Sequence, residues 1–194
     1  DPPGTLFEYC NSASLLLSAI IQETTGMKAS QFAEQNLFDP LGILDYEWRE
    51  NPEGITIGWG DLYLMPHDMA KIGQLYLDGG VWGSQRIVTA DWVAESTRQQ
   101  VPAFTLEDGY GYQWWIDHDG IYMALGYRGQ FIFIVPERQL VVVFTSDLED
   151  NDFFIPEFLL KEYIISAAVS SEAIPEDPRR VQQMERLIDA LGAP

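Results

Sequence analysis

The hydrophobic pattern of the chain changes near residue 108, and this change limits the fold more than any other feature. Four short apolar segments follow, with only a few residues between them, at 110–116, 121–125, 130–135 and 140–146. Their length and alternation predict strands, and links this short allow only antiparallel pairing of neighbours. The segments 117–120 (Asp-His-Asp-Gly) and 136–139 (Pro-Glu-Arg-Gln) have the composition of tight turns. We therefore expect an antiparallel meander.

Helical patterns dominate the part before residue 108. The segment 12–25 is rich in Leu and Ile and is followed by Gly26, which predicts a largely buried helix with a glycine stop. A second helix is expected to begin at a Ser30 cap and to end at Pro40.

Loop and helix alternate in the next stretch. Residues 45–65 are rich in Gly, Pro and Trp and are expected to form a loop. A third helix is predicted from Pro66 to about Asp78, and Thr89 can cap a short fourth helix that carries Trp92.

A covering helix is expected after the meander, at about 153–169. Five of its residues are predicted to cover one face of the sheet: Phe154, Phe158, Leu159, Tyr163 and Ile164. Helices first, strands later and a covering helix predict an α+β fold. We divide the chain into a mostly helical half (1–107), the strands with their covering helix (108–170), and a polar tail helix (171–194).

The charge balance bears on partners. The chain holds 11 basic and 30 acidic residues, a net charge of −19, which argues against nucleic acid and anionic membranes as partners. The single Cys10 excludes an internal disulfide and a cysteine-based zinc cluster. The acidic segment 147–152 lacks the spacing of a calcium loop, so we expect a solvated turn, no metal and no cofactor.

The triplet at 9–11 has the composition of a catalytic corner. Tyr9 and Asn11 lie two residues apart, just before an apolar helix. A phenol can act as a general base when nearby cations stabilise the phenolate, and an amide two residues on can hold a substrate or orient such a cation. The alternative is structural, with Tyr9 as a core residue and Asn11 as a helix cap.

Several segments together resemble the serine β-lactamase and penicillin-binding-protein-like hydrolases, above all the class C-related branch of esterases, DD-peptidases and aminohexanoate-oligomer hydrolases. They are Pro-Gly-Thr-x-Phe-x-Tyr-x-Asn at 3–11, Leu-Phe-x-Pro-Leu-Gly-Ile at 37–43, the segment 68–82, Tyr-Gly-Tyr-Gln-Trp-Trp at 110–115, and Gly-Tyr-Arg-Gly-Gln at 126–130. The resemblance covers residues 3 to about 168. It implies a β-lactamase/DD-peptidase-like antiparallel sheet with flanking helices, incomplete because the amino-terminal part is absent.

In this family a Ser-x-x-Lys helix upstream of the corner carries the nucleophile. No serine of this chain is followed by Lys three residues later. The resemblance therefore implies the carboxy-terminal portion of a serine hydrolase that acts on an ester or amide through an acyl-enzyme. Tyr9 would be the base that works with the absent Lys, and Asn11 the adjacent polar contact. The portion alone is expected to be inactive.

The family also has a strand that carries Lys-Thr-Gly or His-x-Gly and completes the oxyanion hole. Lys71-Ile72-Gly73 lies within a predicted helix and does not qualify, so the segment 124–127 is the better match. This implies the Tyr127 backbone N–H as an oxyanion donor and Gly126 as a substrate contact. The Lys or His of the motif is missing, which argues against β-lactam hydrolysis. Arg128 could supply a cation, or be a plain surface residue.

Aromatic residues next to these motifs are further candidates. Tyr112 and Trp114 could line a substrate pocket, and strand alternation places Trp114 and Trp115 on opposite faces; core packing is the alternative. Cys10 is expected to be a buried small hydrophobic residue.

Two other functions remain open at this stage. One is a non-catalytic module that binds a peptide-like ligand. The other is an interaction module that forms a homodimer through an unfinished sheet edge. The compartment is unknown; relatives are often exported, and the signal for it would lie upstream.

Overall fold

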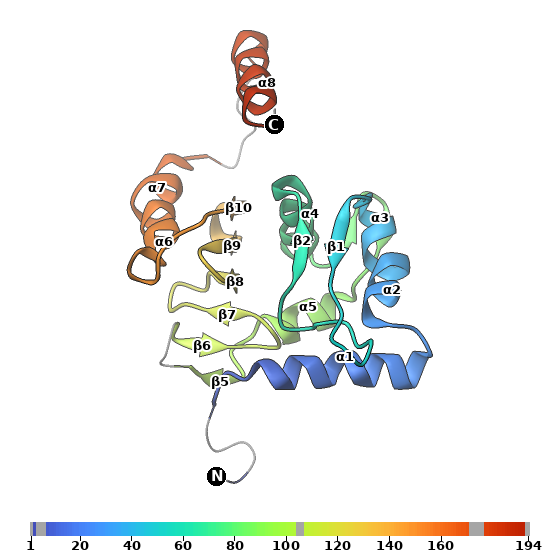
Figure 1. Ribbon diagram of the computed structural model, residues 1–194. Helices are drawn as coiled ribbons and strands as arrows, with labels where there is room; N and C mark the ends of the chain where they lie inside the picture. Colours follow the sequence, from blue (N-terminus) through green and yellow to red (C-terminus); the bar gives the residue numbers. More distant parts are fainter. Residues whose placement is uncertain (1, 3–6, 104–106, 171–176, 193–194) are drawn as a thin grey trace.

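The computed structural model describes residues 2, 7–103, 107–170 and 177–192 (Figure 1). The Pro-Gly-Thr motif at 3–5 and all of residues 171–176 therefore lie outside the described residues, and the family motif can be followed only from Phe7. The main body has three layers: an antiparallel sheet in the middle, the helix α4 on one face and the carboxy-terminal helix on the other (Figure 1). None of the described helices is long and apolar enough to cross a membrane.

The central sheet has six strands in the order β10-β9-β8-β7-β6-β5, and every neighbouring pair is antiparallel. Its strands are β5 (Val101–Pro102), β6 (Gly109–Tyr110), β7 (Trp115–Ile116), β8 (Tyr122–Gly126), β9 (Gln130–Val135) and β10 (Leu140–Phe144). The predicted meander and its two turns are confirmed.

The sheet departs from the prediction at its β5 end. The segment 110–116 was expected to be one strand, but it forms β6 and β7, because the chain turns between them. The Gly111 N–H donates to the Trp114 carbonyl at 2.8 Å, and Gln113 has a φ of 66°. The strand β5 was not predicted, since a two-residue strand that contains a proline carries almost no pattern.

Alternation along β9 divides the core between the two faces of the sheet. Phe131, Phe133 and Val135 belong to the cluster under the carboxy-terminal helix, whereas Ile132 and Ile134 belong to the cluster under α4. Strand residues of opposite parity point to opposite faces, so both faces of this central strand are covered.

The helix α4 (Pro66–Leu77) lies against β9 and β10. A Cβ added to Gly73 would lie 2.6 Å from Val141 Cγ1, so only glycine allows this close approach of helix and sheet. On its other side, Leu75 is fully buried in a third cluster with Phe38 and Leu41. The helix therefore joins the sheet to the helical part of the molecule.

The predicted second helix forms, but its boundaries differ. It consists of α2 (Ala29–Ala33), the π-turn η1 (Glu34–Phe38) and α3 (Asp39–Leu41). Lys28, and not Ser30, is the residue at its N-cap. Pro40 does not end the helix, because it lies within α3, directly after the π-turn η1. Gly42, with a φ of 63°, ends it instead.

The segment 45–65 is not all loop, as was predicted. It contains β1 (Tyr46–Trp48) and β2 (Leu62–Leu64), which pair antiparallel. A second small pair, β3 (Val81–Trp82) and β4 (Gln85–Arg86), follows α4. The helix α5 (Ala90–Ser96) begins as predicted, since the Thr89 hydroxyl accepts the Trp92 N–H at 3.3 Å.

The first helix, α1 (Asn11–Thr25), forms and stops at Gly26, but the predicted burial is wrong. Its buried residues are Ser14 and Ser18, whereas Leu16 is 64% exposed and Ile20 is 56% exposed. The serine side of α1 faces Gly58, where an added Cβ would lie 2.5 Å from the Ser14 carbonyl oxygen. This close contact turns the apolar side of the helix outward.

The carboxy-terminal helix consists of α6 (Ile155–Leu159), the π-turn η4 (Leu160–Ile164) and α7 (Ile165–Ala167). It covers the sheet as expected. Ile164 packs against the core cluster as predicted, and it does so together with Leu160, Ile165 and, just before the helix, Phe153. Phe154, Phe158 and Tyr163 were predicted to face the sheet and instead point outward. The π-turn changes the spacing along the helix, so a regular 3.6-residue period assigns the wrong face. A last helix, α8 (Pro178–Gly192), stands apart from the body (Figure 1).

Candidate functional site

The Tyr9–Asn11 corner lies where the chain enters α1. Cys10 is the residue at the N-cap, with extended backbone (φ −140°), and Asn11 is the first helical residue, not the cap. Tyr9 is 46% exposed, and Asn11 is exposed too. Cys10 is also exposed, which overturns the expectation of a buried small hydrophobic residue. All three residues are therefore accessible at one end of α1.

Aromatic contacts fix this corner to the sheet. The Tyr9 ring lies 5.4 Å from the Trp115 ring and 6.1 Å from the Tyr110 ring, measured between centroids. Phe7 packs on Tyr110 at 4.8 Å. Burial, together with the neighbouring Tyr9 phenol, raises the pKa of Tyr110, so Tyr110 stays protonated as a structural residue. Tyr9 is thus held by its ring while about half of it remains open to solvent.

The carboxyl half of β8 has a free edge. Tyr122 and Met123 pair with β7, while Ala124, Leu125 and Gly126 pair only with β9. Within the described ranges no strand pairs with the other side of the segment 124–126. Unpaired backbone N–H and C=O groups along a strand edge can bind an extended ligand.

This free edge and the start of α1 lie at the same end of the sheet. The strands β7 and β8 are antiparallel, so the start of β7 and the segment after Met123 lie at the same end of the sheet. There, the Ser14 hydroxyl of α1 donates to the Gln113 side-chain oxygen at 3.2 Å. Ser14 is one helical turn from Asn11, which brings the corner to the end of the sheet where β8 is open.

The turn after β8 carries the expected oxyanion donor. Tyr127 is 79% exposed, and the turn is closed by positive φ angles at Arg128 (61°) and Gly129 (88°). The segment after β10 holds it in place, because the Leu148 N–H donates to the Arg128 carbonyl at 3.0 Å. The Gln130 side-chain amide also donates to the Ser146 carbonyl.

Arg128 is not a free cation. Its guanidinium forms an ion pair with Asp147 and approaches Glu149 at 3.6 Å. The acidic segment that was expected to be a solvated turn therefore neutralises Arg128. This pairing favours a role in holding the turn over a direct role in binding a substrate carboxylate.

The two aromatic candidates differ in exposure. Tyr112 is 45% exposed and stacks on Trp92 of α5, with ring centroids 5.5 Å apart and planes 7° from parallel. Trp114 is buried between Tyr76 and Tyr122, at 4.6 Å and 5.5 Å. Trp114 is thus a core residue beneath α4, on the face opposite Trp115, and offers no exposed ring to a substrate.

The sequence predicted neither the stacking of Tyr112 on Trp92 nor the small cavity that lies beside α1. The cavity, of about 200 Å³, is lined by Ser14, Leu17, Ser18, Ile21, Ala29, Phe32, Ala33, Trp48, Gly58 and Gln113. Only the close approach of α1 to Gly58 could have signalled it, and that approach depends on tertiary packing. No group of three or more His, Cys, Asp or Glu residues in the described part of the chain could hold a metal ion.

Lys71 is excluded from the site by its contacts. It lies on α4, where its ammonium group donates to the Gly42 carbonyl at 2.8 Å and pairs with Asp68 at 2.7 Å. The Lys71-Ile72-Gly73 triplet is helical, as predicted, and belongs to the packing of α4.

Comparison with known proteins gives a consistent result. The family model described as Beta-lactamase matches residues 1–159. A 6-aminohexanoate-dimer hydrolase of Paenarthrobacter ureafaciens is 27% identical over 158 residues, which cover 75% of this chain and 40% of that protein. The chain therefore spans less than half the length of this relative.

Solved structures agree on the fold. A Bacillus anthracis protein described as a 6-aminohexanoate-dimer hydrolase superposes with a TM-score of 0.74 at 25% identity, covering 91% of this chain and 47% of that one. A Mycobacterium bovis β-lactamase gives a TM-score of 0.67 at 19% identity, covering 84% of this chain and 66% of that one. The family model matches residues 1–159, which is most of the chain, and the relatives include hydrolases. The chain therefore belongs to the β-lactamase family.

Proposed function

We propose that these residues form the carboxy-terminal part of a serine hydrolase that cleaves an ester or an amide through an acyl-enzyme. One observation supports this above the others: the half-open edge of β8, which ends at the exposed Tyr127, lies at the same end of the sheet as the Tyr9–Asn11 corner. An extended substrate that pairs with this edge would present a carbonyl group near the Tyr127 amide.

The nucleophile would come from sequence outside these 194 residues, on a Ser-x-x-Lys helix. The exposed apolar side of α1, which includes Leu16, Leu17 and Ile20, offers such a helix an apolar surface next to Tyr9 and Asn11. A helix with an apolar stripe gains stability by burying it, at roughly 25 cal/mol per Å². This placement would bring the serine and the lysine beside the Tyr9 phenol.

In the proposed reaction, the serine oxygen attacks the substrate carbonyl and its proton passes to Tyr9, which shares it with the lysine. The negative charge on the tetrahedral oxygen is stabilised by the serine and Tyr127 backbone N–H groups. The intermediate collapses, the bond to the leaving amine or alcohol breaks, and Tyr9 returns the proton to it. Water then attacks the acyl-enzyme by the same proton path and releases the acid. Asn11 would hold the substrate amide or orient the lysine.

The substrate is proposed to be a linear amide or ester, not a β-lactam. Ala124 stands where a Lys or His would contact a penicillin carboxylate, and Arg128 is paired with Asp147 and Glu149. The relatives named for hydrolysis of a 6-aminohexanoate dimer, which is a linear amide, are in line with this choice. The Trp92–Tyr112 pair would offer the chain of such a substrate an exposed aromatic surface.

The test uses the full natural chain that contains these residues, a fluorophosphonate probe and a p-nitrophenyl ester. We expect covalent labelling of one serine and turnover of the ester. Tyr9→Phe should lower kcat about 10²–10⁴-fold, because the general base is lost. Tyr63→Phe is the matched control: Tyr63 is half-exposed like Tyr9 but lies on β2 beside Arg49, and it should leave kcat unchanged.

Two results would change the proposal. Labelling and turnover that Tyr9→Phe leaves intact would remove Tyr9 from the mechanism. Absence of labelling, together with binding of a peptide-like ligand, would favour the non-catalytic module. Residues 1–194 alone are expected to give neither labelling nor turnover.

A further inference from the structure

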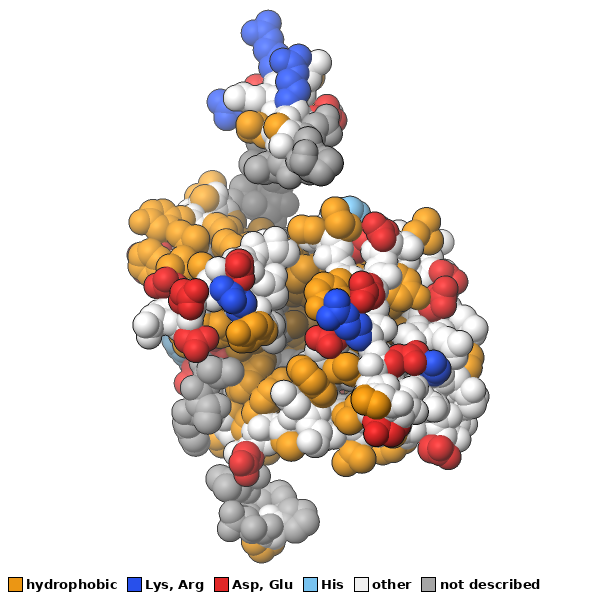
Figure 2. All heavy atoms as spheres, viewed as in Figure 1, with side chains coloured by type: hydrophobic (Ala, Val, Ile, Leu, Met, Phe, Trp, Pro, Cys, Tyr) orange, Lys and Arg blue, Asp and Glu red, His pale blue; other side chains and the backbone are white. Residues whose placement is uncertain are grey.

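The outer side of the carboxy-terminal helix carries an apolar stripe without a cover among the described residues. Phe154 is 42% exposed, Phe158 is 56% exposed and Tyr163 is 61% exposed. The π-turn η4 brings the last two together although they are five residues apart, with ring centroids at 6.0 Å. We call Phe154, Phe158 and Tyr163 the outer stripe. Figure 2 shows the apolar surface over α6 and α7, at the upper left.

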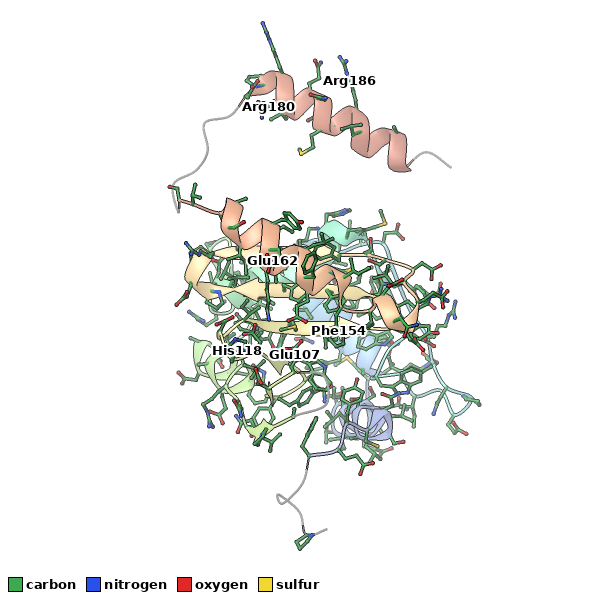
Figure 3. All side chains as sticks on the ribbon, turned by 90° about the vertical axis from the view of Figure 1, so that its left-hand side faces the viewer. Glu107, His118, Phe154, Glu162, Arg180 and Arg186 are labelled. Carbon is green, nitrogen blue, oxygen red and sulfur yellow. The ribbon has the colours of Figure 1, made fainter. Side chains whose placement is uncertain are left out.

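The helix α8 carries a second apolar stripe. Met184 is 53% exposed and Leu187 is 59% exposed, and Val181 lies one turn before Met184 on the same side. We call Val181, Met184 and Leu187 the tail stripe. In two views at right angles α8 stands clear of the body (Figures 1 and 3). Asp177, which precedes α8, accepts the backbone N–H groups of Arg179 and Arg180 and pairs with the Arg180 side chain at 3.6 Å.

The charges around the two stripes are opposite. In a chain with a net charge of −19, α8 carries three arginines against two acidic residues, and Arg180 is next to Val181 of the tail stripe. The outer stripe is bordered by exposed Glu162, and Lys161, its neighbour, is turned inward to pair with Asp117 and Glu157. Figure 3 shows Phe154 and Glu162 on the side of the helix that faces away from the sheet. Arg180 beside the tail stripe thus matches Glu162 beside the outer stripe in charge.

We propose that α8 of one copy docks antiparallel on the outer stripe of a second copy, and that the contact is returned, so that the two copies form a symmetric dimer. Arg180 and Met184 are four residues apart, as are Glu162 and Phe158 in the opposite direction. Aligning Arg180 with Glu162 places Met184 on Phe158 and Leu187 opposite Ile155, next to Phe154. Residues four apart share one helix face, so polar and apolar contacts match in the same register.

The second copy is the occupant that the structure favours. Residues 168–177 could span about 33 Å when extended, which would let α8 fold back on its own body. In the structure α8 nevertheless stands clear of the body, so its own body does not cover the tail stripe (Figure 3). If α8 of each copy binds the outer stripe of the other, the two contacts are identical and related by a two-fold axis. Two-fold symmetry is the commonest symmetry of protein dimers.

The test is the molar mass of the full natural chain as a function of concentration, by sedimentation equilibrium. We expect a monomer–dimer equilibrium. Met184→Glu should weaken the dimer at least tenfold, because it places a charge in both apolar contacts. Arg186→Glu is the control for a charge change in α8: it lies about 200° around the helix from Met184 and should not alter the dissociation constant.

A charge exchange tests the register. Glu162→Arg and Arg180→Glu should each weaken the dimer about fivefold, and the double variant should recover most of the affinity, since opposite charges meet again in both contacts. A double variant weaker than either single one would overturn the register. A monomeric mass at every concentration would overturn the dimer, whether α8 then covers its own body or another segment covers the outer stripe. The serine labelling described above is independent of these results.

Discussion

The two faces of the central sheet are covered in different ways. On the α4 face the contact is apolar and very close: Gly73 lies against Val141 and Ile132, and in the described residues no ion pair joins α4 to the sheet. On the other face the carboxy-terminal helix adds a charged cluster to its apolar contact. Lys161 pairs with Asp117 of the β7–β8 turn at 3.2 Å and with Glu157 at 2.6 Å.

The difference shows what each contact depends on. Close apolar packing is insensitive to pH, but its free energy falls sharply when side-chain volume is lost. A buried charged cluster depends on the protonation of its members. Asp117 has a side chain that is only 1% exposed and also accepts the backbone N–H groups of Asp119 and Ile121. The carboxy-terminal helix is therefore tied to the turn through one lysine.

The largest expected effect is on the α4 face. Ile134 is fully buried in the cluster beneath α4. Ile134→Ala should lower the free energy of unfolding by about 3 kcal/mol, through lost burial and the cavity left behind. Urea unfolding between about pH 5 and 8 measures it, and the loss should be the same throughout. A loss that varied strongly with pH would contradict the assignment of this face as purely apolar.

The next effect is on the opposite face. Burial alone would lower the pKa of Lys161, but Glu157 and Asp117 outweigh it and raise the pKa, so Lys161 stays charged. Lys161→Met should cost about 2 kcal/mol at neutral pH, because Asp117 is left charged and unpaired in the interior. Urea unfolding at neutral pH measures the loss, and an unchanged midpoint would contradict a structural role for this lysine.

A matched control separates burial from ion pairing as such. Lys28 pairs with Glu50 at 2.6 Å, but both side chains are more than a third exposed. Lys28→Met should change stability by less than about 1 kcal/mol, as exposed ion pairs do. Equal losses in the two variants would remove the distinction between the charged cluster and an ordinary surface pair.

This contrast also explains how far the sequence predicts the fold. The meander, α4 and the Thr89 cap follow from local patterns, because periodicity and turn residues are local properties. The burial of α1 was predicted wrongly. An apolar pattern indicates a helix face that can be buried, but it does not show which segment packs on that face. The outward position of Phe158 was missed because a π-turn leaves no clear mark in the sequence.

Some features of the candidate site could be predicted from the sequence, and others could not. Tyr9, Asn11, Gly126 and Tyr127 could be proposed from motifs. The free edge of β8 could not, because it depends on where β7 ends, and β7 is only two residues long. The pairing of Arg128 with Asp147 and Glu149 joins segments that meet only in the folded sheet. Geometry of this kind needs the tertiary structure.

The smallest expected effect concerns Glu107, whose carboxyl group interacts electrostatically with Glu157, Lys161 and Asp117 of the charged cluster. Burial raises its pKa from about 4.5 to about 7, with a further contribution from Glu157. Between these values the folded protein holds a proton that the unfolded chain has lost, so stability falls as the pH rises through this window. Glu107→Gln removes the titration and should be more stable than the parent by about 1 kcal/mol at pH 8, a value reduced for the partial exposure of the side chain. The two proteins should converge near pH 4. Urea midpoints across this range measure the difference, and parallel curves for the two proteins would contradict the raised pKa of Glu107.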